Sequence, residues 1–205
     1  MFKKMVFNLI SLVLVSFYSF NVMAANCDEK SPAYVEQGDK YFDIEEVAGI
    51  TDKQKKSIKK IFSSVKLKLK GKGSTSVCFV GENGKLDKQT EPEKYEAEFS
   101  LQPDSAISLS IDAEKLKQRV TYNETLIFFD AGSLFVIKKI TGNSVEAVSK
   151  HRVPVGGARK AGGGVANSVL REEMVKLTAH GKGLEIKSTV FVNGYFAEEY
   201  SRSFR

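Results

Sequence analysis

The sequence contains no tryptophan and has only two histidines among its 205 residues. Neither His151 nor His180 has a cysteine or carboxylate at the spacing of a metal site, so no metal motif is present. There is no Cys-x-x-Cys pair for redox chemistry and no Gly-x-Ser-x-Gly elbow for a nucleophilic serine. Adjacent acids such as Glu172 and Glu173 lie on predicted strands, where neighbours point to opposite faces. The sequence therefore indicates a non-enzymatic protein without catalytic residues, metal or cofactor.

A hydrophobic run long enough to span a bilayer is also missing. Residues 5–20 are mostly apolar, but the run falls short of the roughly 20 residues of a transmembrane helix. Lys3 and Lys4 precede it, and small or permissive side chains follow it, as signal peptidase requires. We expect a signal peptide over residues 1–24, cleaved after Ala24, and hence a periplasmic or secreted protein. An uncleaved membrane anchor is the alternative.

Cysteine is scarce, but both cysteines lie in the expected mature chain, residues 25–205. In an oxidising compartment, Cys27 and Cys78 predict one disulfide. It would close a loop of about fifty residues, for which the chain-entropy model gives about 4 kcal/mol of stabilisation. Two free thiols or a redox site are the alternatives. The mature chain has about 180 residues, which suits a single β-rich domain with a sizeable core.

Positive charge is concentrated in one short stretch, residues 51–72. The whole chain carries only +6, which is not the profile of a nucleic-acid-binding protein. This stretch, however, holds nine lysines and one acid, a local charge of +8. It predicts a surface for an anionic membrane or another envelope polyanion, the alternative being a solvated outer face. The lysines of this predicted basic surface are Lys53, Lys55, Lys56, Lys59, Lys60, Lys66, Lys68, Lys70 and Lys72.

Residues 52–64 form the clearest helix. Thr51 and Gln54 make a capping box, in which each side chain bonds the backbone N–H of the other residue. Apolar residues then recur at helical spacing and form one stripe, which predicts an amphipathic helix with a single buried face. We expect residues 25–64 to form an N-terminal helical segment ahead of the sheet.

Residues 65–205 alternate apolar and polar side chains in about eight to ten runs, which predicts as many antiparallel strands. Gly71 and Gly73 allow a sharp bend or a bulge in the chain before residues 77–80. A meander of this length removes its exposed edges by closing as a barrel, and a sandwich is the alternative. The barrel resembles a lipocalin in outline only, because the Gly-x-Trp start of that family is absent from a chain without tryptophan.

Asn193 and Gly194 are the strongest turn signal, since both tolerate the positive φ of a type I′ hairpin. Extending the register of this turn gives facing pairs along one side: Val192–Tyr195, Val190–Ala197, Ile186–Ser201 and Leu184–Ser203. Most of the partners after the turn are small, so we expect these residues to line a cavity on the inward face. The alternative is that small residues fit the taper of a filled barrel.

A glycine-rich loop over residues 156–164 contains Arg159 and Lys160. Its backbone N–H groups are suited to an anion, and these two side chains would add positive charge. The loop lacks the Gly-Lys-Ser/Thr ending of a nucleotide-binding loop. A mobile connection between two strands is the alternative.

Three functions remain open from these observations. The first is an exported carrier or binding protein for an apolar or lipid-like ligand. The second is an envelope interaction protein, such as an inhibitor or an immunity-type partner, that acts through the basic surface. The third is a small outer-membrane β-barrel, which would need continuous lipid-facing bands, whereas residues 145–153 and 170–179 carry charges on both faces.

Overall fold

The computed structural model describes residues 26–44, 49–82, 84–101, 107–115, 118–126, 135–154 and 168–205. Between residues 107 and 126, only Ile107 has a described side chain. The expected signal peptide and the loop with Arg159 and Lys160 lie outside the described residues, so both stay predictions. Within the described ranges, no helix has the length and apolar character needed to cross a membrane.

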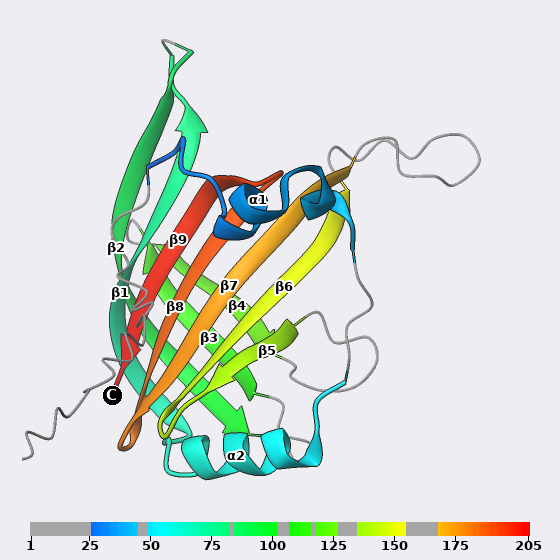
Figure 1. The fold of residues 1–205 in the computed structure, drawn as a ribbon. Coiled ribbons are helices and arrows are strands. Elements are labelled where there is room, and N and C mark those ends of the chain that lie inside the picture. Colours follow the sequence, from blue (N-terminus) through cyan, green and yellow to red (C-terminus); the bar gives the residue numbers. More distant parts are fainter. Residues whose placement is uncertain are drawn as a thin grey trace, which may run out of the picture.

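Two short helical elements begin the described chain. The α1 helix (Pro32–Gln37) is capped by Ser31, whose side chain accepts from the backbone N–H groups of Ala33 and Tyr34. The 3₁₀ helix η1 (Gly38–Phe42) follows directly. Residues 26–44, called the N-terminal segment below, lie on the outer side of the sheet near one end (Figure 1).

The amphipathic helix predicted over residues 52–64 is α2 (Asp52–Phe62). Its capping box is formed, because Gln54 N–H donates to the Thr51 hydroxyl while Thr51 N–H donates to Gln54 Oε1. The apolar stripe is buried, and α2 lies across one end of the sheet (Figure 1). The helix therefore closes the end of the sheet opposite α1.

The strands that follow are β1 (Lys68–Val80), β2 (Leu86–Leu101), β3 (Ile107–Lys115), β4 (Gln118–Leu126), β5 (Phe135–Ile140), β6 (Ser144–Pro154), β7 (Ser168–His180), β8 (Gly183–Val192) and β9 (Tyr195–Phe204). They form one sheet in the order β4–β3–β2–β1–β9–β8–β7–β6–β5, and every pairing is antiparallel. The antiparallel meander is thus confirmed. The pairing of β1 with β9 joins its two halves.

The sheet is not closed as a barrel, which corrects the closed barrel expected from the sequence. In the described part of the chain, β4 and β5 end the strand order and do not pair with each other. Closure needs an unbroken ring of ladder hydrogen bonds. The ring is interrupted at β5, a strand of only 6 residues that pairs with β6.

The sheet curls so that side chains of distant strands meet on one face, called the inner face below. One apolar cluster contains Tyr95 and Phe99 of β2 together with Val145 of β6 and Leu177 of β7. The buried side chains of α2 belong to the same cluster. The core therefore lies between the curled sheet and α2, where apolar burial stabilises both.

Glycines in β1 allow β9 to approach it closely. Gly71 lies opposite Phe204, and Gly73 lies opposite Arg202. A Cβ on Gly71 would lie 2.7 Å from Phe204 Cδ1, and a Cβ on Gly73 would clash with the carbonyl oxygen of Ser201. β1 runs through both glycines in continuous register with β2, so neither glycine forms a β-bulge. The glycines serve close approach of two strands instead.

The last hairpin has the predicted turn but a different register along its strands. Asn193 and Gly194 have φ of 51° and 85°, and Val192 faces Tyr195. A β-bulge next to Val190 then shifts the pairing by one residue. The observed pairs are Val190–Glu198, Ser188–Tyr200, Ile186–Arg202 and Leu184–Phe204.

This shift corrects the pairing on which the predicted cavity depended. Ser201 and Ser203 alternate with the buried Tyr200, Arg202 and Phe204 and therefore lie on the other face. Leu184, Ile186 and Val190 do lie on the inner face, where large side chains face them. Val192 is half-buried, Ala197 lies within the bulge, and Tyr195 is 44% exposed. The predicted cavity was argued from small residues facing large ones, and the observed pairing removes that argument.

Candidate functional site

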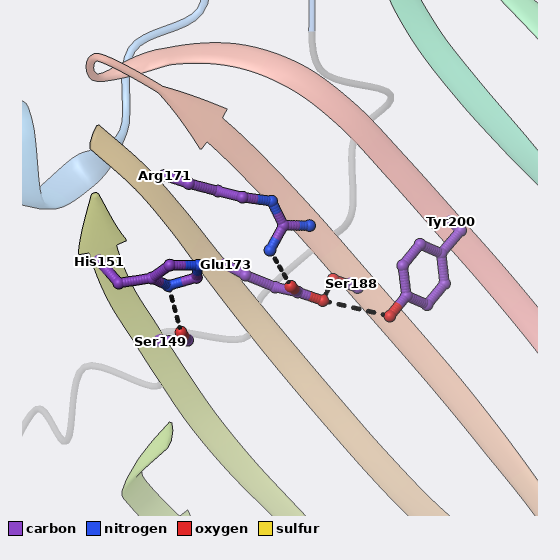
Figure 2. Close-up of polar contacts among 6 residues, drawn as sticks. All are labelled: Ser149, His151, Arg171, Glu173, Ser188 and Tyr200. Carbon is purple, nitrogen blue, oxygen red and sulfur yellow. Dashed lines mark hydrogen bonds and ion pairs between the residues drawn. The ribbon is translucent and has the colours of Figure 1, made fainter. Parts of the chain in front are cut away.

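The inner face changes from apolar to charged along its strands, with increasing distance from α2. On β7 its residues run Ala179, Leu177, Val175, Glu173 and Arg171. On β6 they run Val145, Ala147, Ser149 and His151, and on β8 Leu184, Ile186, Ser188 and Val190. The apolar ends belong to the core. At the other end lies a group called the inner polar cluster below: Ser149, His151, Arg171, Glu173, Ser188 and Tyr200 (Figure 2).

Glu173 is the centre of this cluster and is only 8% exposed. Its Oε1 accepts hydrogen bonds from Ser188 Oγ at 2.8 Å and from the Tyr200 hydroxyl at 3.2 Å. Its Oε2 pairs with Arg171 Nη1 at 2.5 Å (Figure 2). A buried carboxylate is costly unless it is paired and hydrogen-bonded, and here both oxygens are engaged. Glu173 is therefore a structural anchor and not an available general base.

His151 and Ser149 extend the cluster across β6. Ser149 Oγ lies 3.0 Å from His151 Nδ1, and the pairing of β6 with β7 sets His151 opposite Arg171. Burial lowers the pKa of His151 below its ordinary 6.5, and the charge of Arg171 lowers it further while Glu173 opposes them. No described group orients the second ring nitrogen, as a catalytic triad requires.

Arg171 is the cation of the cluster, and Glu173 uses only part of its hydrogen-bond donors. Its side chain is 31% exposed, and its Nη1 is used by Glu173. Among the described residues, no further partner is found for its remaining guanidinium N–H groups. A guanidinium presents five N–H donors in a planar fork. Arg171 can therefore hold Glu173 and bind a second anionic group at the same time.

A second set of buried charges lies in the next row of inward-facing residues, closer to α2. Arg202 is 5% exposed, and its guanidinium carbon lies 4.1 Å from the Tyr200 ring centre and 5.3 Å from that of Tyr95. On β2, Glu93 is 3% exposed and accepts a hydrogen bond from Thr75 Oγ1 at 3.2 Å. Cation–π contacts of this kind stabilise a desolvated guanidinium. The polar interior therefore continues from β6 across to β2.

The outer face carries a different buried acid, Glu172. Its Oε2 accepts hydrogen bonds from Ser31 Oγ at 2.5 Å and from the Tyr41 hydroxyl at 2.7 Å. Burial raises the pKa of Tyr41 well above its usual value, and the hydrogen bond to Glu172 raises it further. Lys150 Nζ lies 4.5 Å from the Tyr41 ring centre. These contacts fasten the N-terminal segment to β6 and β7.

The predicted disulfide between Cys27 and Cys78 is confirmed. The pairing of β1 with β9 ends at Val77. Beyond that point the N-terminal segment takes the place of β1, since Phe196 N–H donates to Glu29 O and Ser31 N–H to Gly194 O. The disulfide therefore links the N-terminal segment to β1 at the point where the partner of β9 changes from β1 to the N-terminal segment.

The predicted basic surface is divided between two parts of the fold. Lys53, Lys56, Lys59 and Lys60 are exposed on α2. Lys55, on the same helix, is partly buried. Lys66 is exposed in the connection to β1.

On the outer face of β1, Lys68 and Lys70 are exposed opposite Glu98 and Glu96 of β2, and Lys70 Nζ lies 3.4 Å from Glu96. Lys72 lies opposite Lys94. Cross-strand acids thus offset part of the charge on β1.

Sequence reasoning missed the inner polar cluster, although two of its signals were visible. Glu172 and Glu173 were expected on opposite faces, and the structure places them so. The charges on both faces of residues 145–153 and 170–179 were the second signal. What the sequence could not show is that Tyr200 and Ser188 reach Glu173, because that contact depends on the bulge in β9.

Metal ligands do not gather in the described residues, since no group of three or more His, Cys, Asp or Glu side chains could hold an ion there. Comparison with known proteins adds no assignment. No protein-family model matches the chain, and a search of curated proteins finds no matching sequence.

Proposed function

We propose that this protein is an exported, non-enzymatic binding protein that takes an amphipathic, lipid-like ligand on the inner face of its sheet. The observation that carries this proposal is that the inner polar cluster shares its end of the inner face with exposed apolar side chains of β1, Val77 and Phe79. Binding sites for small molecules are mostly apolar with a few placed polar groups. A face that combines exposed apolar side chains with a polar cluster suits a ligand with one apolar and one polar part.

The apolar part of the ligand would lie toward β1. Val77 and Phe79 continue the inner face of this strand beyond Thr75, and they are 40% and 45% exposed. Large apolar side chains left in water on a concave face gain free energy when a ligand covers them, by about 25 cal/mol for each Å² of apolar surface. These two residues therefore support the apolar half of the proposal.

The polar part would be anionic and would lie at Arg171 and His151. The spare donors of Arg171 suit a carboxylate, which a guanidinium binds through two parallel hydrogen bonds. His151, with its lowered pKa, offers a neutral ring beside it. The negative charge of Glu173 does not prevent the ligand carboxylate from binding, because Arg171 would lie between the two carboxylates.

Dodecanoate and dodecanol have the same alkyl chain but differ in charge, so together they test the apolar and the anionic contact separately. Titration calorimetry is expected to show that the wild-type protein binds dodecanoate more tightly than dodecanol. Arg171→Gln should weaken dodecanoate binding about tenfold or more, since a charged hydrogen bond contributes about 1.5–3 kcal/mol, and should leave dodecanol binding nearly unchanged. Arg152→Gln removes the same charge from an exposed position and is the matched control.

Two results would contradict the proposal. One is the absence of dodecanoate binding in the wild-type protein. The other is an equal loss in the Arg171 and Arg152 variants, which would indicate a general effect of net charge.

A second function, an interaction protein that acts through a basic surface, is favoured by α2. Lys53, Lys56, Lys59 and Lys60 make no ion pair with any described residue. Exchanging all of them for Gln should abolish binding to a polyanion such as heparin without lowering thermal stability. Retained binding would exclude α2 as the contact.

A further inference from the structure

A hollow of about 530 Å³ lies at the α2 end of the sheet, away from the inner polar cluster. It is called the basic hollow below, and it is lined by Lys66, His180, Lys182, Glu185, Ser203 and Arg205 among others. Its cations come from three parts of the chain: the connection after α2, the turn between β7 and β8, and the end of β9. We propose that the basic hollow is a binding site for a ligand that carries a phosphate group.

Backbone hydrogen bonds hold the three segments in place. Lys66 N–H donates to Lys182 O at 3.1 Å, and Ser64 Oγ donates to Gly181 O at 2.8 Å. Arg205 N–H donates to Lys70 O at 2.8 Å and its carbonyl accepts from Lys70 N–H. The backbones that carry Lys66, Lys182 and Arg205 are therefore fixed around the hollow, so little backbone order has to be gained when a ligand binds.

Gly183 shows how closely two of these segments approach each other. A Cβ at this position would lie 2.5 Å from the carbonyl oxygen of Phe204. Only glycine allows the start of β8 to pass this close to the end of β9. The close approach brings Lys182 and Arg205 to the same hollow.

The charge balance of the basic hollow is positive. Lys66, Lys182 and Arg205 are exposed and make no ion pair with another described residue. The acid in the lining, Glu185, is engaged by Lys187 at 3.2 Å and by His180 at 3.4 Å. Burial would raise the pKa of Glu185, but Lys187 and His180 bring it below its ordinary value on balance. Three cationic side chains therefore line the hollow, against the carboxylate of Glu185 and the α-carboxylate of Arg205, and the balance stays positive.

Phosphate fits this arrangement better than a carboxylate does. Lysine ammonium groups act as point charges without a planar geometry, and a terminal phosphate offers several oxygens and a charge near −2 to cations that arrive from different directions. The volume of about 530 Å³ lies within the range of small-molecule sites. The hollow has room for a phosphate together with an attached group, so a phosphate ester fits it.

Two sources of such a ligand, a soluble phosphate ester and a lipid headgroup, are distinguished by two probes. Titration calorimetry with glycerol 3-phosphate, with glycerol as the uncharged reference, reports the soluble ester. Sedimentation with phosphatidylglycerol vesicles, with phosphatidylcholine vesicles as reference, reports the headgroup. We expect binding to at least one charged probe, and the probe that binds identifies the source.

The double variant Lys66→Gln/Lys182→Gln should weaken that binding about tenfold or more, because it removes two charged donors. Lys40→Gln/Lys138→Gln is the control, since it changes net charge equally at exposed positions that do not line the hollow. The control should bind within about twofold of the wild-type protein, as expected for exposed charges that a Debye length of about 10 Å screens. Thermal unfolding of both variants verifies that they fold.

The proposal is overturned if the folded wild-type protein binds neither charged probe, or if the control loses as much binding as the double variant. Neither result bears on the proposed ligand of the inner face, because no residue of the basic hollow belongs to the inner polar cluster.

Discussion

The Tyr41 hydroxyl donates a 2.7 Å hydrogen bond to Glu172, a carboxylate that lies 131 residues later on the outer face of β7. Glu172 is 3% exposed and Tyr41 is fully buried. The N-terminal segment therefore supplies the partner that makes a buried acid tolerable on the sheet. The stability of the protein, and its dependence on alkaline pH, should therefore depend on this contact.

Tyr41→Phe should lower the free energy of unfolding by about 1–3 kcal/mol, because Glu172 loses one of two donors and stays buried. Urea unfolding followed by circular dichroism measures the change. Tyr34→Phe is the matched control, since the Tyr34 hydroxyl makes no hydrogen bond to a described residue. Equal stability of the Tyr41 variant and the wild-type protein would show that water can replace the hydroxyl.

Stability at alkaline pH should depend on the same hydroxyl. The pKa of Tyr41 is raised above its ordinary 10.0, so the folded protein keeps a proton that the unfolded chain releases. The stabilisation is therefore complete below pH 10 and is lost as pH rises from there toward the folded pKa. Between pH 9 and about 11, the wild-type protein should lose more unfolding free energy than Tyr41→Phe does. Parallel curves for the two proteins would argue against a raised pKa.

His151 should affect stability on the acid side. Its pKa is lowered from 6.5 in the folded state, so the unfolded chain binds a proton first as pH falls. The stabilisation is present above pH 6.5 and is lost as pH falls below that value. Urea unfolding of wild-type protein and of His151→Gln between pH 8 and about 5 should show a steeper loss for the wild type. A shallower loss in the wild type would mean that Glu173 outweighs burial and Arg171.

Gly73→Ala should destabilise the protein, since its Cβ would clash with the backbone of β9. Overpacking of this kind costs roughly 1–3 kcal/mol. Gly142→Ala is the control, because nothing lies within 4 Å of a Cβ there. Thermal unfolding of the two variants compares them directly. If both have the same midpoint, β1 can move away from β9 without penalty.

Removal of the disulfide with Cys27→Ser/Cys78→Ser should lower the free energy of unfolding by up to about 4 kcal/mol in the chain-entropy model. The bond closes a loop with a sequence separation of 51. Wild-type protein unfolded in urea with a reductant should match the variant. A loss below about 1 kcal/mol would mean that strain in the folded state offsets the chain-entropy effect.

Local patterns of the sequence predicted the elements that depend on neighbouring residues. Thr51 and Gln54 form the expected capping box, and Asn193 and Gly194 form the expected turn. Both depend on contacts within a few residues, for which side-chain chemistry and φ preferences suffice. The pairing of Cys27 with Cys78 was also determined, because the expected mature chain contains no other cysteine.

Tertiary structure decided the closure of the sheet and the contents of its inner face. A bulge of one residue in β9 turned Tyr200 and Arg202 inward and Ser201 outward. The alternation of side chains along a strand has a period of two, so a shift by one exchanges the faces. That shift replaced an expected cavity wall of small residues by a network around Glu173, and it depends on contacts with β1 and β7 that no local pattern encodes.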